Sequence, residues 1–454
     1  WRFIPHIRYP MAMRHGESGA GRIEAAAGTS RRPVSRPVLR ALRGAAVGVA
    51  AAVPLVCWPG LAAPFSTPKL VLLAAWVVAG LLAALAGRIP LLAALDSLLY
   101  GLVLGWIGLV SVSAILAPHV SAEVLLLALL PAGAFVLQAG LKPKPAAVLG
   151  AVAAAGAVVA LVAVLQSAGA DPFRLLGWAG PVAGSPRMRV FSTLGNPNFV
   201  AAFLTAAAPA VWAAGRFLPD RKWRTLFLTA GGLLLAGGIL ATGSRAPALA
   251  ALGVAAWAAF RSLKKWHLAV LPILFSLLVV GVSTARPLAD TLAGRLFIWQ
   301  VSLPHALESP LLGGGPGSFQ LNYPAWETAR LAVARDEARF AGFQNHSHND
   351  YLETLVDYGA PGLLLLLAIP AAVLGRFCFA KRNPADPAAE GAAAGVVALL
   401  ALALVDFPLH RPAEAFLFWL FLAIVHSSHT ILAAPGPDAG PAEAARRISQ
   451  GGSV

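Results

Sequence analysis

The residues with the clearest potential for chemistry form one short run, His346-Ser347-His348-Asn349-Asp350-Tyr351. This run ends the longest polar segment of a chain that is otherwise almost entirely apolar, and nine residues separate Asn349 from Gly359. Histidines are rare in such a composition. A pair of imidazoles held against the start of a membrane helix indicates proton chemistry at the membrane surface.

Three roles are open to the histidine pair. A metal site would need further ligands, and His305, Asp350 and Glu353 form no recognised ligand pattern around it. A structural role as a cap of the following helix is the second alternative. General base catalysis fits best, because an unperturbed imidazole titrates at about pH 6.5 and can accept a hydroxyl proton. Asp350 or Glu353 could then orient the ring.

Two arginines supply fixed positive charge. Gly243-Ser244-Arg245 joins two apolar runs almost without a loop, which puts Arg245 at the membrane boundary. There it is either an interfacial residue among lipid headgroups or a forked donor for a phosphate. Arg295 opens an amphipathic segment and shares a helix face with Trp299, so an interfacial helix is the alternative to a binding site. With the imidazoles, these guanidiniums indicate a site for a phosphorylated lipid.

Further motifs carry weaker signals. The glycine-rich segment 311–319 could let backbone amides approach an anion. Asn196-Pro197-Asn198 is foremost a helix start, with Asn196 as its cap, and Arg189 just before it could join a phosphate cluster. The charged stretch 326–340 has a helical period and is expected to be mostly a solvated face. Asp406, His410 and Arg411 are interpreted as a structural turn.

The composition predicts a polytopic all-α membrane protein. Of the 454 residues, 58% are hydrophobic and only 12% are charged, whereas a soluble protein carries about a quarter charged residues. Both cysteines, Cys57 and Cys378, lie in apolar runs and indicate neither a disulfide nor a thiolate metal site. The net charge of +15 does not indicate nucleic-acid binding, because much of it lies in a basic N-terminal segment that is expected to contact anionic lipid.

Apolar runs long enough to span a bilayer, about 20 residues, divide the chain into five parts. We expect a basic cytoplasmic arm at 1–43, nine membrane helices within 44–284, a periplasmic catalytic loop at 285–358, three helices within 359–433 and a cytoplasmic tail at 434–454. The twelve predicted helices are 44–62, 69–87, 97–117, 123–140, 146–168, 197–215, 225–243, 246–260, 267–284, 359–377, 392–409 and 413–433.

The positive-inside rule predicts the orientation. With both ends in the cytoplasm, most of the 35 Lys and Arg residues fall in the arm, the short inner loops and the tail. Arg245, Arg295 and His348 then share the outer face. The rule therefore predicts a multi-pass membrane protein whose site faces the outer side of the membrane.

These motifs together resemble the O-antigen ligase family, whose relatives include O-antigen polymerases and protein O-oligosaccharyltransferases. The resemblance spans roughly residues 185–380. It rests on Asn196-Pro197-Asn198, Gly243-Ser244-Arg245, Arg295 with Trp299, the turn 313–319, and the spacing from His348-Asn349 to Gly359 and Gly362. His346-Ser347 also fits the first two positions, but nine residues later it meets Asp357 instead of glycine. The spacing therefore favours His348.

The resemblance implies a metal-independent, inverting glycosyltransferase of the GT-C type that needs no cofactor. It also implies that the protein lies in the bacterial inner membrane with its active site facing the periplasm. Its donor would be an undecaprenyl-diphosphate-linked glycan, and its acceptor a hydroxyl of lipid A-core in lipopolysaccharide biosynthesis. By this analogy His348 deprotonates the acceptor, while Arg245 and Arg295 bind the departing diphosphate. The residues expected to bind substrate are Arg189, Asn198, Trp299, His346 and Asn349.

Two classes of alternative remain. Within the family, the same motifs serve ligation, polymerisation of repeat units and transfer to a protein hydroxyl. Outside it, a twelve-helix transporter is the main rival, and a non-catalytic lipid-binding scaffold is a lesser one. Transporters place polar groups near the midplane, whereas here the apolar runs are free of charge and the polar residues gather on one predicted face. This distribution favours a reaction site at the surface.

Overall fold

A computed structural model describes residues 36–87, 96–178, 190–261, 288–342, 344–379 and 386–433, together with isolated positions between 273 and 280. These residues form helices and turns and contain no strand. The long helices of the bundle are α1 (Arg36–Leu55), α2 (Thr67–Leu85), α3 (Ser97–Leu116), α4 (Ala122–Leu141), α5 (Pro145–Ser167), α6 (Pro197–Arg216), α7 (Arg221–Thr242), α8 (Ala246–Arg261), α12 (Asp350–Phe379), α13 (Pro387–Leu402) and α14 (Pro412–Ala433). The remaining elements are η2 (Pro172–Leu176), α10 (Leu288–Ala306), α11 (Ser318–Val333), η5 (Arg335–Phe340) and η6 (Pro408–His410).

The predicted membrane protein is confirmed. Eight helices of the described chain are long and apolar enough to cross a bilayer, and α13 and the first part of α14 are shorter apolar helices. Each predicted span coincides with a helix except 267–284, most of which lies outside the described residues. Helix α6 also starts where predicted, because Asn196 Oδ1 accepts a hydrogen bond from the Asn198 amide at 2.9 Å.

Helix α12 begins at Asp350, nine residues before the predicted boundary. Asn349 Oδ1 caps the new start by accepting hydrogen bonds from the Tyr351 and Leu352 amides, both at 3.0 Å. The helix bends at Gly359, whose φ of 67° lies in the left-handed region. A Cβ at this glycine would lie 2.6 Å from the carbonyl oxygen of Pro310. The first turns of α12 therefore belong to the segment expected to be loop.

Two other predicted boundaries differ from the structure. Helix α1 starts at Arg36, inside the segment expected to be an arm, and Arg43 Nε donates to the Leu141 carbonyl at 2.7 Å. Helix α13 ends at Leu402 instead of 409. A continuous apolar helix could not satisfy the buried carboxylate of Asp406, which instead pairs with Arg411 in the turn that follows.

The centre of the bundle is packed with small residues. Helices α6 and α13 approach closely at Gly391, where a Cβ would lie only 2.7 Å from the Pro209 carbonyl oxygen. Helix α14 is buried along residues 412–428. Such backbone approach is typical of helices associating in a membrane.

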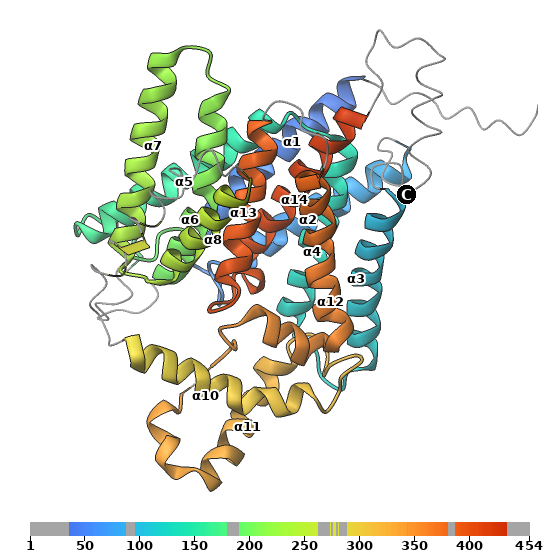
Figure 1. The fold of residues 1–454 in the computed structure, drawn as a ribbon, viewed down its shortest axis with the longest axis vertical. Helices are drawn as coiled ribbons and strands as arrows, with labels where there is room; N and C mark the ends of the chain where they lie inside the picture. Colours follow the sequence, from blue (N-terminus) through green and yellow to red (C-terminus); the bar gives the residue numbers. More distant parts are fainter. Residues whose placement is uncertain are drawn as a thin grey trace, which may run out of the picture.

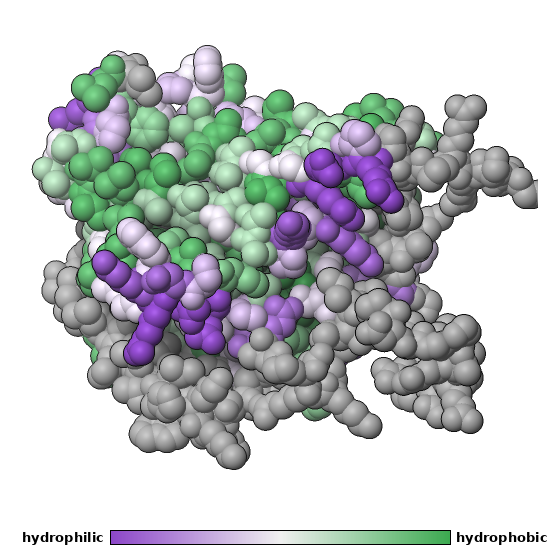
Figure 2. All heavy atoms as spheres, turned by 90° about the horizontal axis from the view of Figure 1, so that it is seen from above, coloured by the Kyte–Doolittle hydropathy of each residue, from purple (hydrophilic) through white to green (hydrophobic). Residues whose placement is uncertain are grey.

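The two ends of the bundle differ in character. At one end α10 and α11 lie below the long helices, beside the start of α12 and the α13–α14 turn (Figure 1). The segment from Arg295 that was predicted to be helical lies in α10, which starts earlier, at Leu288, and ends at Ala306. Figure 2 looks onto the opposite end, where hydrophilic side chains gather mainly in two groups beside hydrophobic surface. Exposed basic residues of the α4–α5 and α6–α7 turns are Lys142, Lys144, Arg216, Arg221 and Lys222.

Candidate active site

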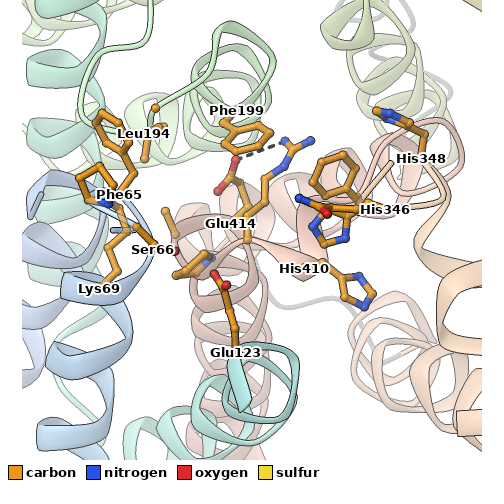
Figure 3. A pocket seen from close by; sticks show the side chains of 18 of the residues that line it. Phe65, Ser66, Lys69, Glu123, Leu194, Phe199, His346, His348, His410 and Glu414 are labelled. Carbon is orange, nitrogen blue, oxygen red and sulfur yellow. Dashed lines mark hydrogen bonds and ion pairs between the residues drawn. The ribbon is translucent and has the colours of Figure 1, made fainter. Parts of the chain in front are cut away.

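An open pocket of about 350 Å³ lies at the α10–α11 end of the bundle. Four stretches of chain supply most of its lining: residues 63–69, the segment just before α6, residues 344–348, and residues 407–414 (Figure 3). Glu123, at the start of α4, adds a carboxylate. Segments that are far apart in sequence therefore meet in one cavity, and both predicted histidines line it.

His346 is tightly oriented. Its Nδ1 lies 2.7 Å from Glu353 Oε1, and its ring stacks on Phe407 with the centroids 4.0 Å apart. Because a carboxylate only accepts, Nδ1 carries the proton and Nε2 is left for the pocket. Glu353 itself is only 2% exposed. A buried carboxylate behind an imidazole stabilises the cation that forms when the ring takes up a proton.

The His348 ring lies edge-on to the same Phe407 ring, with the two ring centroids 5.2 Å apart. Its side chain is 26% exposed, and Nδ1 is 3.8 Å from Asp406 Oδ1. This separation is too long for a hydrogen bond, and among the described residues Nδ1 has no hydrogen-bond partner. His348 also has a φ of 54°, which is unusual for a residue with a side chain.

Asp406 and Arg411 form a buried ion pair beside His348. The Arg411 guanidinium also lies over the rings of Phe199 and Phe407, at 3.9 and 4.2 Å from their centroids. Burial alone would raise the pKa of Asp406, but Arg411 and His348 outweigh it and hold that pKa well below the usual range. Asp406 is therefore a permanent anion next to the imidazole.

His410 is the third imidazole in the pocket wall, and its side chain is buried. Its Nδ1 lies 2.6 Å from Asp350 Oδ1, and its Nε2 lies 3.7 Å from Glu353 Oε1. Burial alone would favour the neutral ring, but the carboxylates of Glu353 and Asp350 raise the pKa of His410 to about 10. His410 is therefore a cation at neutral pH and does not act as a base there.

Three buried carboxylates lie on one face of α12, and two of them, Asp350 and Glu353, hold these groups. Asp350, Glu353 and Asp357 are spaced as i, i+3 and i+7, so they share a helix face. Asp350 also accepts from the Leu409 amide at 2.8 Å, and so it holds the α13–α14 turn. Glu353 holds the His346 segment. One helix face therefore ties separate parts of the site together.

The third carboxylate changes the interpretation of the glycine-rich segment. Asp357 accepts hydrogen bonds from the Gly317 amide at 2.9 Å and the Phe319 amide at 3.0 Å. The Gly314 and Gly315 amides donate to carbonyls of α12 at 2.9 and 3.0 Å. The prediction that these amides approach a ligand anion is therefore wrong, because the chain's own carboxylate occupies the start of α11.

Arg295 and Trp299 on α10 are not part of the pocket lining, but both interact with groups beside it. Burial lowers the pKa of Arg295, and Arg411 acts in the same direction while Asp406 opposes both. Arg295 thus lies within electrostatic reach of the Asp406–Arg411 pair. Trp299 Nε1 donates to the Ser347 carbonyl at 2.9 Å. Its observed contact is with the histidine segment, and a contact with substrate stays a prediction.

The other predicted residues are less directly placed. Arg245 is half-buried in the α7–α8 turn and, like Asn198 beside the α6 cap, is not part of the pocket lining. Asn349 acts as the α12 cap, and its substrate contact stays untested. Arg189 lies outside the described residues. Among the described residues, no group of three His, Cys, Asp or Glu side chains is arranged to hold a metal ion.

Sequence reasoning missed several pocket residues. The predicted structural turn of Asp406, His410 and Arg411 also contributes to the site: His410 and Arg411 line the pocket, and Asp406 pairs with Arg411 behind it. Lys69, which is 1% exposed, also lines the pocket and donates to the Val56 and Thr193 carbonyls at 2.6 and 2.9 Å. The available signal was the presence of charged residues at the ends of apolar runs, where an ionised group requires a partner.

A comparison with protein families places this geometry in context. A family model described as O-antigen ligase matches residues 230–367, which contain Arg245, Arg295, His346 and His348 but not the α13–α14 turn. A comparison with curated proteins found no match. The chain therefore carries, at residues 230–367, a segment that matches the O-antigen ligase family.

Proposed function

We propose that this protein is a glycosyltransferase that moves a glycan from undecaprenyl diphosphate to an acceptor hydroxyl, with lipid A-core as the acceptor. The match to this family supports a glycosyltransferase-like enzyme that acts on a lipid-linked glycan. Undecaprenyl diphosphate as the donor carrier, lipid A-core as the acceptor and a site that faces the periplasm are proposed in addition. The observation that carries it is the open pocket in which His348 lies beside the buried Asp406–Arg411 pair, close to Arg295.

The proposed reaction begins at the acceptor. His348 takes the proton of the acceptor hydroxyl through Nε2, because Nδ1 faces the Asp406 anion, which stabilises the imidazolium that forms. The hydroxyl oxygen then attacks the anomeric carbon with inversion. The bond from that carbon to the diphosphate oxygen breaks, and both electrons leave with the diphosphate.

The departing diphosphate requires positive charge. Arg295 supplies a half-buried guanidinium, which is worth more in a low-dielectric site than in water. Arg245 supplies a second, from the α7–α8 turn, once substrate is bound. Holding donor and acceptor together contributes several kcal/mol more, about 7–11 in favourable cases. Arg189, Asn198, His346 and Asn349 are proposed to contact the glycan or its carrier, and the reaction as proposed needs no metal or cofactor.

Two related reactions share this chemistry. An O-antigen polymerase uses a second lipid-linked glycan as the acceptor, and a protein O-oligosaccharyltransferase uses a serine or threonine hydroxyl. The base and the diphosphate site would be unchanged in both. Only the acceptor differs, so the test must identify the acceptor separately from the mechanism.

The experiment is complementation of a bacterial host that lacks its own O-antigen ligase. The intact chain, His348→Ala, Arg245→Ala and Arg295→Ala are compared at equal membrane expression, with Arg221→Ala as a control from the opposite end of the bundle. The intact chain and the control should restore a glycan ladder on lipopolysaccharide, and the three site variants should not.

Other outcomes decide between the parts of the proposal. Accumulation of lipid-linked glycan in the presence of the intact chain would reject lipid A-core as the acceptor. A ladder of normal intensity with all three site variants would reject the proposed mechanism.

A further inference from the structure

Ser347 lies between the two histidines in the sequence, and each of its polar groups makes a hydrogen bond. It is fully buried, and its amide donates to Glu353 Oε2 at 2.8 Å. The single proton of its Oγ is shared between the Asn349 carbonyl at 2.8 Å and Glu353 Oε2 at 3.1 Å. Its carbonyl accepts from Trp299 Nε1 at 2.9 Å. Glu353 on α12 and Trp299 on α10 therefore form hydrogen bonds with different atoms of the same residue.

The residue that follows is the one with the unusual backbone. A left-handed conformation costs a residue with a side chain about 1–3 kcal/mol and persists only when its surroundings impose it. For His348 those surroundings are Ser347 on one side and the cap of α12 on the other, where Asn349 N donates to Ser347 Oγ at 3.2 Å. The strained conformation is thus imposed from both sides.

Both carboxylate oxygens of Glu353 accept hydrogen bonds from this segment. Oε2 accepts from the Ser347 amide, and Oε1 accepts from His346 Nδ1 at 2.7 Å. The side chain is 2% exposed, so water cannot replace either contact. It lies in the first turn of α12, where the helix dipole favours a negative charge.

We propose that Glu353 is a positioning residue which, together with Trp299, clamps Ser347 and thereby holds His348 in the left-handed conformation that presents its imidazole to the pocket. The inference rests on the proposed role of His348 as the base. Glu353 touches no substrate in this account. It acts on turnover through the position of a neighbouring side chain.

Asp357 provides a matched control on the same helix face. It is also a fully buried carboxylate that accepts two hydrogen bonds, but its donors are the Gly317 and Phe319 amides at the start of α11. Replacing it changes a buried, hydrogen-bonded carboxyl group on the same helix without releasing Ser347. Any general effect of losing a buried carboxylate should therefore appear in both variants.

The test compares Glu353→Gln and Asp357→Asn in the full-length purified protein. Glutamine keeps the shape but presents an NH2 group, so either Ser347 or His346 faces a donor instead of an acceptor. Transfer is measured from a synthetic undecaprenyl-diphosphate-linked glycan to rough lipopolysaccharide, per mole of folded protein. We expect Glu353→Gln to lower kcat by at least about tenfold, since small misplacements of a catalytic group are costly. KM for both substrates should change less than about twofold, and Asp357→Asn should retain kcat.

Trp299→Phe completes the test, because it removes the other half of the clamp while keeping an aromatic ring. If both residues act through Ser347, the double variant should lose much less than the product of the two single losses. An unchanged kcat in Glu353→Gln, an equal loss in Asp357→Asn, or fully multiplicative losses would each overturn the clamp.

A second readout does not depend on turnover. The rate at which diethyl pyrocarbonate modifies His348, followed by peptide mass, should rise several-fold in Glu353→Gln and stay unchanged in Asp357→Asn. A wild-type protein without transfer activity would contradict the proposed function, whereas equal modification rates in wild type and Glu353→Gln would contradict the clamp itself.

Discussion

At the residue scale, one aromatic ring separates two imidazoles in different electrostatic surroundings. Phe407 stacks with His346 and meets His348 at its edge. His346 is backed by the Glu353 carboxylate, whereas His348 lies near an anion that Arg411 already neutralises. The two imidazoles therefore differ in the charged side chains that lie behind them.

The buried ion pair behind His348 should be essential to both stability and turnover. Asp406→Asn takes the nearer of two carboxylate partners from the buried Arg411 guanidinium and leaves Glu414 Oε1 at 3.5 Å, which should cost about 3 kcal/mol. The matched control is Asp96→Asn, which removes the partner of Arg376 in a pair whose side chains are 34% and 39% exposed, and it should cost at most about 1 kcal/mol. Thermal unfolding in detergent and transfer assays check both. Equal losses of stability in the two variants would contradict this account.

The buried histidine of the pocket wall predicts a pH dependence of stability. Because the folded protein raises the pKa of His410 to about 10, its pairing contributes fully below the unfolded pKa of about 6.5. That contribution declines as the pH rises and is lost through pH 10. The difference in unfolding temperature between wild type and His410→Gln should therefore be largest below pH 6.5 and shrink towards pH 10. A constant difference over this range would argue against a charged His410.

At the element scale, α12 is the part that organises the site. Its first two turns carry the three carboxylates that hold the α13–α14 turn, the histidine segment and the start of α11. Its bend at Gly359 lets the helix continue into the membrane while the Pro310 carbonyl packs against the backbone. The Ala360 amide donates to that carbonyl at 2.7 Å.

The bend predicts a sharp difference between two glycines of this helix. Gly359→Ala places a Cβ 2.6 Å from the Pro310 oxygen and forces alanine to adopt a φ of 67°. It should destabilise the protein by several kcal/mol, at least about 1–2 from the backbone alone. A Cβ at Gly375 would meet nothing within 4 Å, so Gly375→Ala should be neutral or stabilise by up to about 1 kcal/mol. Comparable unfolding temperatures for the two variants would contradict the bend.

The sequence allowed the helices to be predicted well and the site only in part. Apolar runs of membrane length and the Asn196 cap are local signals, and they correspond to observed helices. The contacts from Asp350 to His410 and from His348 to Asp406 join residues about sixty positions apart. No local period encodes such contacts. Even so, the spacing of Asp350, Glu353 and Asp357 on one helix face was visible, and it contradicted a loop before residue 359.

At the scale of the whole molecule, charge divides the two ends of the bundle. The pocket lies at the end with α10 and α11, while exposed basic residues of the α4–α5 and α6–α7 turns lie at the other. Short basic turns remain in the cytoplasm during membrane insertion. The pocket is accordingly expected to open towards the periplasm.

This orientation can be measured with single cysteines in a protein whose Cys57 and Cys378 are replaced by serine. Glu308→Cys, on a largely exposed side chain near α10, should react with a membrane-impermeant maleimide in intact spheroplasts. Lys222→Cys, in the α6–α7 turn, should react only after lysis. The reverse pattern would mean that the pocket faces the cytoplasm.

The central claim is that glycan leaves its lipid diphosphate in the pocket that His348 lines. The most direct test is purified full-length protein with a synthetic undecaprenyl-diphosphate-linked glycan and rough lipopolysaccharide, in which glycosylated acceptor and free undecaprenyl diphosphate are both quantified. We predict that wild type forms both products in equal amounts. His348→Gln and Arg295→Lys should each lose at least about a hundredfold in rate, as expected for a general base and for a forked donor. Wild-type turnover that both variants retain in full would contradict the claim.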